Sequence, residues 1–251
     1  MPRPLSSFSS LRRSRRSQRG VALYVVIVFV MLSMLLASWA ARGSLFNEIV
    51  VGNDADYRRA FEAAQAMLQD AELDIRGVQP SGEACLPVQS KTDVCRTVAT
   101  EVYFDIETKD LESMLAVVKA NGPTTGCYKG ICEKRIGAQD FWNDKTKLTA
   151  MMAENVGARY GQFTGADAAG TANPLLAVRT AGSGAWYWVE ILPYIDPNVS
   201  LLSHMPPGSN VDRFSPSRKK LMVYRITAIA RGNKPSTEVV LQSVLSVQAF
   251  E

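Results

Sequence analysis

The chain of 251 residues begins with a basic segment that is followed by a long, unbroken apolar run. Residues 1–19 contain six arginines and no acidic residue, and residues 21–41 contain no ionisable side chain except Tyr24. As a helix rising about 1.5 Å per residue, this run extends about 31 Å, which is enough to cross a hydrocarbon core of about 30 Å. The segment from Val21 to Ala41 is therefore expected to span a membrane once.

The distribution of charge around this run predicts its orientation. Basic residues are dense before the run and sparse directly after Arg42, which places the N-terminus in the cytoplasm and the rest of the chain outside. A cleaved secretory signal is the alternative, because Ser38-Trp39-Ala40 has a small-x-small pattern. The apolar region of a signal peptide, however, runs only about 7 to 15 residues. The length therefore favours a retained anchor in contact with membrane lipid.

The net charge of the chain comes from its first residues. The whole sequence has 28 Lys and Arg against 24 Asp and Glu, a net charge of +4. Without the six leader arginines, 22 basic residues face 24 acidic ones. The remainder is close to neutral, so overall basicity is no argument for a nucleic-acid partner, and none is predicted.

An amphipathic helix is predicted after the span, across residues 44–75. Apolar residues recur there at steps of three and four, which places them on one helical face: Ala60, Phe61, Ala64, Met67, Leu68, Ala71 and Ile75. Much of the rest of the helix is polar: Glu62, Gln65, Gln69, Asp70, Glu72 and Asp74. Gly52-Asn53-Asp54 predicts a softened segment or a break with a new N-cap. Gly77 and Pro80 predict the end of the helix.

Residues 78–251 are long enough for one domain with its own core. Aromatic and β-branched runs predict strands at residues 185–192, 220–230 and 237–247, the last two forming a hairpin, with a further strand at 98–106. Short helices are predicted at 111–120 and about 140–154. The expected fold is α+β, with a long N-terminal helix packed on an antiparallel sheet. The expected parts are a leader (1–20), the helix (21–77) and the ectodomain (78–251).

Four cysteines, Cys85, Cys95, Cys127 and Cys132, lie beyond the span in a compartment that the topology makes oxidising. Their local spacing favours two disulfides, Cys85 with Cys95 and Cys127 with Cys132, although four cysteines allow three pairings. A zinc site made of all four thiolates is the alternative. Zinc-binding pairs usually lie two to four residues apart, so the ten-residue separation of the first pair fits zinc poorly.

Catalytic chemistry has little support in this sequence. The only histidine, His204, precedes Met205-Pro206-Pro207 in a predicted loop, and Ser183 lies in a Gly-Ser-Gly loop with no evident base. We find no phosphate-binding loop, no hydrolase nucleophile motif and no calcium-binding spacing. No catalytic residue, metal site or cofactor is predicted. Trp186 and Trp188 are expected to pack in the core and not to form an exposed patch.

Several segments, in their order along the chain, resemble the PilX family of minor pilins. They are Gly20-Val21-Ala22-Leu23 at the start of the apolar run, Val51-Gly52-Asn53, residues 59–66 (RAFEAAQA), residues 127–132 (CYKGIC), Trp142, Tyr160-Gly161 with Thr164-Gly165, residues 186–190, residues 224–228 (YRITA) and residues 240–243 (VLQS). An arginine-rich leader that ends in glycine is also similar to the class III signal sequences of type IV pilins. One difference is that Glu62 and Gln65 stand in exchanged positions relative to the family's usual pattern.

The resemblance implies a function and a maturation route. Prepilin peptidase would cleave after Gly20, and the new N-terminus, Val21, would be N-methylated. The protein would be stored in the inner membrane with its ectodomain in the periplasm. Through the inner-membrane assembly platform, it would join other minor pilins and the major pilin in a tip complex that primes the fibre and presents an adhesin.

Val25 would be the fifth residue of the mature chain, where major pilins carry glutamate. That carboxylate offsets the buried N-terminal ammonium of a neighbouring subunit, since an unpaired charge in apolar surroundings costs several kcal/mol. Its absence indicates a position at the filament tip or in an initiation complex. The alternative is a span that never packs into a filament.

Three other classes of protein were considered. The tip pseudopilin of type II secretion also lacks the fifth-position acid, but it carries an inserted helical domain and a calcium site that this sequence does not indicate. A plain single-pass binding module would keep the span uncleaved. A thiol-dependent periplasmic enzyme would need a reactive pair, and Cys127 and Cys132 lack the Cys-x-x-Cys spacing.

Overall fold

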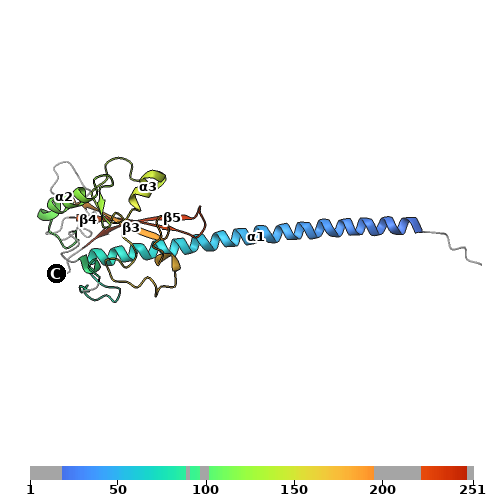
Figure 1. Ribbon diagram of the computed structural model, residues 1–251, viewed down its shortest axis with the longest axis horizontal. Helices are drawn as coiled ribbons and strands as arrows, with labels where there is room; N and C mark the ends of the chain where they lie inside the picture. Colours follow the sequence, from blue (N-terminus) through green and yellow to red (C-terminus); the bar gives the residue numbers. More distant parts are fainter. Residues whose placement is uncertain (1–18, 89–90, 97–101, 195–221, 248–251) are drawn as a thin grey trace, which may run out of the picture. The chain divides into compact units, whose positions relative to one another are not determined.

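The computed structural model describes residues 19–88, 91–96, 102–194 and 222–247 of the chain (Figure 1). The chain divides into two compact units, one ending at Val51 and one beginning at Gly52. Helix α1, Arg19–Arg76, supplies all the described residues of the first unit and the first element of the second. His204 lies outside the described residues, as do the first two residues of the strand predicted at 220–230.

The first unit is an apolar helix whose side chains are exposed. Its large apolar residues, from Val21 to Val51, are all more than a third exposed. Among the described residues, α1 is the one helix that is long and apolar enough to cross a membrane. A helix that is apolar around its whole circumference is stable only against lipid or against other apolar surfaces. The unit therefore has the properties of the predicted span.

The break predicted at Gly52-Asn53-Asp54 is wrong, because α1 continues through these residues. Neither polar side chain caps a new helix. Asp54 forms an ion pair with Arg58, one turn further on, and the Asn53 side-chain oxygen accepts a hydrogen bond from Lys234 Nζ at 2.5 Å. A glycine inside a helix costs only about 1 kcal/mol relative to alanine, so Gly52 alone does not end it. The predicted end is confirmed: Gly77, which has a φ of 65°, follows the last helical residue.

The second unit contains a five-stranded sheet with the strand order β1-β2-β3-β4-β5. The strands are β1 (Cys127–Tyr128), β2 (Ile131–Cys132), β3 (Ala185–Pro193), β4 (Met222–Arg231) and β5 (Glu238–Ser246). The β4–β5 hairpin is confirmed, but the all-antiparallel sheet is not, because β2 pairs with β3 in parallel. A parallel pair requires a long connection, and residues 133–184 provide it. The fold is α+β with a mixed sheet.

One face of the sheet packs on the C-terminal half of α1. The core there combines small helix residues with strand residues, including Ala60, Ala63, Ala64, Met67, Ala71, Tyr187, Val189, Ile191, Ile226 and Ala228. Alanines on the helix face allow the helix backbone to approach the sheet closely. The periodicity that predicted this apolar face is confirmed.

The other face of the sheet carries a second core, formed by Cys127, Cys132, Phe141, Leu148, Met151, Met152, Trp186, Trp188 and Ile229. Helix α3 (Lys145–Met151) and the 3₁₀ turn η4 (Phe141–Asn143) supply its outer layer. Since successive side chains of a strand point to opposite faces, β3 is buried on both sides. Core packing of Trp186 and Trp188 is therefore confirmed, with each side chain 1% exposed.

Two further elements differ from their predictions. The described part of the strand predicted at 98–106, residues 102–106, is not a strand, although its alternating residues Val102, Phe104 and Ile106 are buried. The helix predicted at 140–154 is shorter, because Asp144 accepts hydrogen bonds from the backbone N–H groups of Thr146 and Lys147 and so caps α3.

The remaining helical elements are short. Helix α2, Leu111–Asn121, confirms the prediction for residues 111–120. The other 3₁₀ turns are η1 (Val94–Arg96), η3 (Thr108–Asp110) and η5 (Pro174–Leu176).

A buried aspartate fixes the β4–β5 loop to α1. Asp56 accepts hydrogen bonds from the backbone N–H groups of Asn233 at 2.9 Å and Lys234 at 3.0 Å. Burial alone raises the pKa of Asp56, but these two donors, with Thr237 and Arg59, outweigh it and lower the pKa. The charged carboxylate therefore holds the hairpin against the helix.

Candidate functional site

The residues predicted to control maturation lie together at the start of α1. Gly20, Val21 and Val25 all fall within its first two turns. The Val21 side chain is 68% exposed and that of Val25 43% exposed. No acidic residue occurs in the first turn of α1, and the first acid in the sequence is Glu48. The α1 residues from Val21 to Val25 therefore carry no charged side chain.

The Cys127–Cys132 disulfide closes the β1–β2 hairpin in the manner that the local spacing favoured. The two residues between these strands, Lys129 and Gly130, have φ angles of 48° and 80°, as in the tight turns preferred by hairpins. A Cβ on Gly130 would lie 2.6 Å from the Ala158 Cβ, so glycine is also required for packing. Both sulfur-bearing side chains are buried in the second core.

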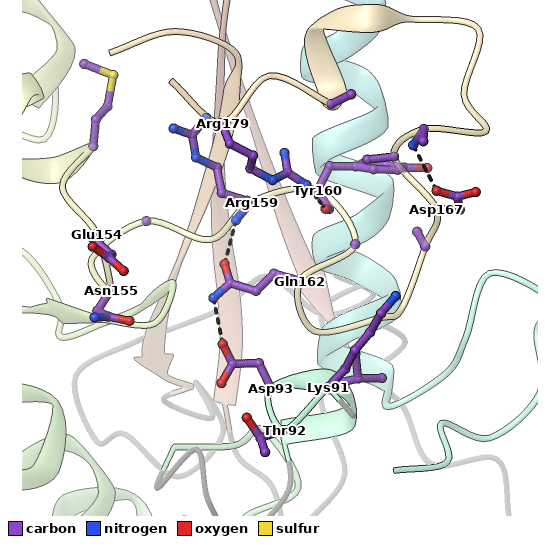
Figure 2. A pocket seen from close by; sticks show the side chains of 18 of the residues that line it. Lys91, Thr92, Asp93, Glu154, Asn155, Arg159, Tyr160, Gln162, Asp167 and Arg179 are labelled. Carbon is purple, nitrogen blue, oxygen red and sulfur yellow. Dashed lines mark hydrogen bonds between the residues drawn. The ribbon is translucent and has the colours of Figure 1, made fainter. Parts of the chain in front are cut away.

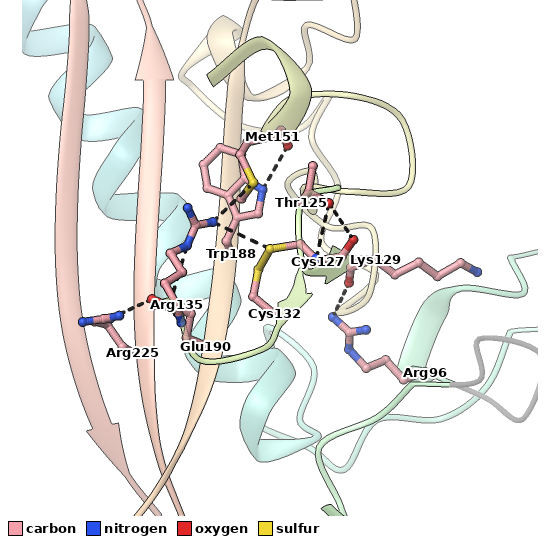
Figure 3. The surroundings of a disulfide bond; sticks show 10 residues. All are labelled: Arg96, Thr125, Cys127, Lys129, Cys132, Arg135, Met151, Trp188, Glu190 and Arg225. Atoms are coloured by element: carbon pink, nitrogen blue, oxygen red, sulfur yellow. Dashed lines mark hydrogen bonds and ion pairs between the residues drawn. A yellow bond between two sulfur atoms is a disulfide. The ribbon is translucent and has the colours of Figure 1, made fainter. Parts of the chain in front are cut away.

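Figure 3 shows how charged side chains surround this disulfide. The Arg135 Nη2 group lies 3.7 Å from Cys127 Sγ and 3.3 Å from Met151 Sδ. Glu190 accepts hydrogen bonds from the Arg135 backbone N–H at 3.0 Å and from Arg225 Nε at 2.7 Å. These contacts attach the loop after β2 to strands β3 and β4.

The Cys85–Cys95 disulfide lies beside a buried ion pair. Cys95 and Arg96 both have positive φ angles, and the Cys95 backbone N–H donates to Phe163 O at 2.7 Å. This geometry turns the Arg96 side chain inward, where its guanidinium lies 3.7 Å from the centre of the Phe163 ring. Since both disulfides are present, the structure gives the cysteines the pairing expected from their spacing.

Arg96 and Asp74 form a bidentate ion pair inside the second unit. Arg96 Nε donates to Asp74 Oδ1 at 2.8 Å, and Nη2 donates to Asp74 Oδ2 at 2.7 Å. The Tyr187 hydroxyl also donates to Asp74 at 2.7 Å, and burial raises the pKa of this tyrosine. Arg96 Nη2 further reaches Lys129 O at 3.0 Å. The pair therefore joins α1, β3 and the β1–β2 turn.

Asp70 is buried one turn before Asp74 on the same helix. It accepts hydrogen bonds from the Gly161 N–H at 2.8 Å and from the Thr164 hydroxyl. Asp70 and Asp74 lie on the polar part of the predicted amphipathic helix, but both are buried, at 1% and 7% exposed. Their position next to the apolar face was the available signal, and the partners that bury them come from distant loops and from β3.

Burial raises the pKa of Asp70 to about 7, against the opposing hydrogen bonds from Thr164 and Gly161. The folded state therefore keeps this proton up to about pH 7, whereas the aspartate of the unfolded chain releases it near its ordinary pKa of 3.8. Since the folded state binds more protons in that window, the contribution of Asp70 to stability falls as pH rises from about 4 to about 7.

We expect Asp70→Asn to remove this dependence. Its free energy of unfolding, relative to wild type, should rise steadily between pH 4 and 7, by up to about 1.4 kcal/mol per pH unit. Chemical denaturation of the detergent-solubilised protein across this range measures the difference. Asp54→Asn, at an exposed site on the same helix, is the matched control and should show no such trend. A constant difference between Asp70→Asn and wild type would contradict the assignment.

The fold and its anchor define a class of protein. An exposed apolar helical segment in the first unit, and in the second an α+β arrangement in which the residues of α1 from Ala60 onward pack on a sheet, are the features of a pilin-like, membrane-anchored subunit. Residues 95–247 match the family described as Type IV pilus assembly protein PilX C-term, and residues 19–69 match the PilX N-terminal family. The chain belongs to the PilX family of type IV pilus assembly proteins, and it is a minor pilin.

Comparison with curated proteins and with solved structures finds no match for the chain. The family assignment places the protein in type IV pilus assembly and not in the type II secretion system considered above. It also makes the protein a structural, membrane-anchored pilus component that interacts with other pilus components.

Proposed function

We propose that this minor pilin takes part in initiating the pilus as a member of a tip or priming complex. The observation that carries the proposal is the valine at position 25, which is an apolar residue where a major pilin has glutamate. The α-amino group of Val21 would still pair with the glutamate of a subunit below. No carboxylate near Val25 would receive the α-amino group of a subunit above, because the sequence has no acid before Glu48.

The proposal includes the maturation route that this position requires. Prepilin peptidase cleaves after Gly20 and the new N-terminus at Val21 is methylated. The helix is held in the inner membrane, with the N-terminus in the cytoplasm and the second unit in the periplasm. Its partners are other minor pilins, the major pilin, a tip adhesin and the inner-membrane assembly platform. Support comes from the six arginines before the span and from the apolar surface of α1.

Counting fibres tests the proposed role. Deletion of the protein should reduce the number of fibres more than their length, because initiation is affected and elongation is not. Val25→Glu should allow the subunit to enter the shaft, although an acid in the span costs about 2.5 to 3.5 kcal/mol on insertion scales. Immunogold labelling should find the wild-type protein at fibre ends and Val25→Glu along the shaft.

Val26→Glu is the matched control. It places the same acid at a neighbouring position, about 100° around the helix, and so has a similar insertion cost without the pairing geometry. It should not enter the shaft. Wild-type protein spread evenly along fibres, together with normal fibre numbers in the deletion strain, would refute the tip-initiation role.

A further inference from the structure

A large open cleft lies in the second unit, on loops that the assembly role above does not use. Its volume is about 1030 Å³, at the upper end of the range of about 300 to 1,000 Å³ for small-molecule sites. The connection between β2 and β3 provides most of its lining, and the segment around Asp93 provides the rest. Figure 2 shows Arg159 and Arg179 next to each other at one end and Asp93 with Lys91 at the other, with Gln162 between them.

The two arginines of the cleft have no acidic partner within ion-pair distance among the residues that the structure describes. Arg159 Nη1 donates to Ser183 O at 2.9 Å, and its guanidinium lies 3.9 Å from the centre of the Trp186 ring. Arg179 donates to Leu176 O at 2.7 Å and to Tyr160 O at 3.0 Å. Carbonyl oxygens and an aromatic ring position both side chains but do not neutralise their charges.

The charges of the two guanidinium groups act on each other. Burial and the charge of Arg179 together lower the pKa of Arg159 to about 10, which still leaves it protonated at neutral pH. Asp70 is close enough to Arg179 to affect its pKa, but the pKa of this buried carboxyl is itself about 7. At neutral pH, Asp70 therefore supplies only part of a counter-charge. An anion bound at this end would relieve the repulsion between the arginines.

The acids that line the cleft do not compensate for this charge. Asp93 is occupied, since it accepts hydrogen bonds from Lys129 Nζ at 2.9 Å and from Gln162 Nε2 at 3.1 Å. Asp167 accepts from the backbone N–H of Ala169 at 2.9 Å, and Figure 2 shows it and Glu154 on opposite sides of the cleft, away from the arginine pair. The arginine pair therefore forms a cationic end of the cleft, and Lys91 adds a further cation at the end near Asp93 (Figure 2).

Eight of the twenty residues that line the cleft are alanine or glycine, so few bulky side chains divide its volume. Several of their backbone N–H groups already have partners, as Gly161 has in Asp70 and Ala169 in Asp167, so recognition of a ligand would rest on charge. An extended polypeptide with several acidic side chains can place one carboxylate at the arginine pair and another near Lys91. The size of the cleft and its cations at two ends fit an extended acidic peptide better than a compact small molecule.

We propose that this cleft binds an acidic, extended segment of another pilus component, with a carboxylate held by Arg159 and Arg179. The inference rests on the assembly role of the protein but not on its position at the tip. It identifies a contact that is separate from the helix-to-helix contacts of α1, and it assigns the recognition to charge.

Ala181 offers a test that removes no existing side-chain contact. It is exposed and lies in a turn closed by the hydrogen bond from Ser183 N–H to Thr180 O at 3.1 Å. Gly182 adopts the positive φ of that turn, 72°, and Ala181 does not need one. Ala181 can therefore be replaced by a larger residue without backbone strain. Ala181→Glu and Ala181→Lys therefore form a pair of similar bulk and opposite charge at the cationic end.

The experiment measures binding of a fluorescent peptide of alternating glutamate and alanine to the full-length protein in detergent micelles. Fluorescence anisotropy should show saturable binding that weakens with salt. The dissociation constant should rise about tenfold or more in Ala181→Glu and in Arg179→Gln, and change little in Ala181→Lys. A peptide with glutamine in place of glutamate should bind at least tenfold more weakly than the acidic peptide.

Three outcomes would overturn the proposal. They are equal binding of the glutamate and glutamine peptides, equal binding by Ala181→Glu and Ala181→Lys, and binding of inorganic phosphate or polygalacturonate without binding of the peptide. The last outcome would assign the cleft to a different anion. Near-ultraviolet circular dichroism of Trp186 and Trp188 confirms that each variant is folded. Peptide binding is measured on the isolated protein, so a failure to bind would contradict the cleft proposal but not the proposed role at the tip. The fibre counts described above test the role at the tip and not the cleft.

Discussion

Asp74→Ala is expected to destabilise the second unit by about 3–5 kcal/mol, because it leaves the Arg96 guanidinium buried without a counter-charge. The arginine side chain is 3% exposed and the carboxylate 2% exposed, so water cannot replace the lost partner. The Tyr187 hydroxyl, which donates to the same carboxylate, also loses its acceptor. Since small domains are stable by only about 5–15 kcal/mol, the loss is a large part of the total.

Chemical denaturation of the detergent-solubilised protein at pH 7, followed by the near-ultraviolet signal of the buried tryptophans, measures this effect. Asp54→Ala is the matched control, since it removes an aspartate of the same helix from an exposed ion pair with Arg58. Exposed pairs at this spacing contribute about 0.3–0.5 kcal/mol. A similar loss in Asp74→Ala and Asp54→Ala would show that the buried pair has no special role.

The double variant Asp74→Ala with Arg96→Met separates the pair from its surroundings. Replacing both partners removes the uncompensated charge, so the double variant should be more stable than Asp74→Ala alone. Additive losses would mean that the two side chains act independently, contrary to the bidentate geometry at 2.8 Å and 2.7 Å.

Local patterns in the sequence predicted the parts of the fold that depend on neighbouring residues. The apolar periodicity of residues 60–75, the β4–β5 hairpin and the aromatic strand β3 all follow from side-chain patterns within one element. The spacing of the cysteines similarly favoured the pairing that is present. Each of these features is decided by residues that are close in the chain.

Features that depend on distant partners were not predicted. Asp70 and Asp74 belong to the polar part of the helix in the sequence, and their burial follows only when tertiary structure brings Thr164, Arg96 and Tyr187 to them. The break predicted at Gly52 is wrong, and the Asn53 side chain there is paired with Lys234 from the β4–β5 loop.

The parallel β2–β3 pair and the cationic end of the cleft could not be predicted for a related reason. The pair depends on the long connection at residues 133–184, and that connection also brings Arg159 next to Arg179. The sequence around Arg159 and the sequence around Arg179 do not indicate that the two side chains are neighbours in the folded protein. The parallel strand pair and the arginine pair therefore depend on how a long loop is placed in the fold, and not on local secondary-structure propensity.

Gly20→Val is expected to abolish maturation, leaving the full-length chain with its basic leader in the membrane. The peptidase site is expected to accept only a small side chain before the cleaved bond. Gly20 lies in the first turn of α1, and a glycine inside a helix costs about 1 kcal/mol relative to alanine, which favours local unwinding for access to the bond. Valine adds bulk at that position and also removes the flexibility of glycine.

Mass spectrometry of membrane-extracted protein should find a methylated N-terminus at Val21 in wild type and the unprocessed chain in Gly20→Val. Gly20→Ala is the control and should still be cleaved, because its side chain stays small. Fibre numbers in Gly20→Val should fall to those of the deletion strain, since the α-amino group of Val21 is not released to pair with a glutamate below. A mature N-terminus near Ala41 in the wild-type protein would instead identify a secretory signal, and the helical anchor that the assembly role requires would be lost.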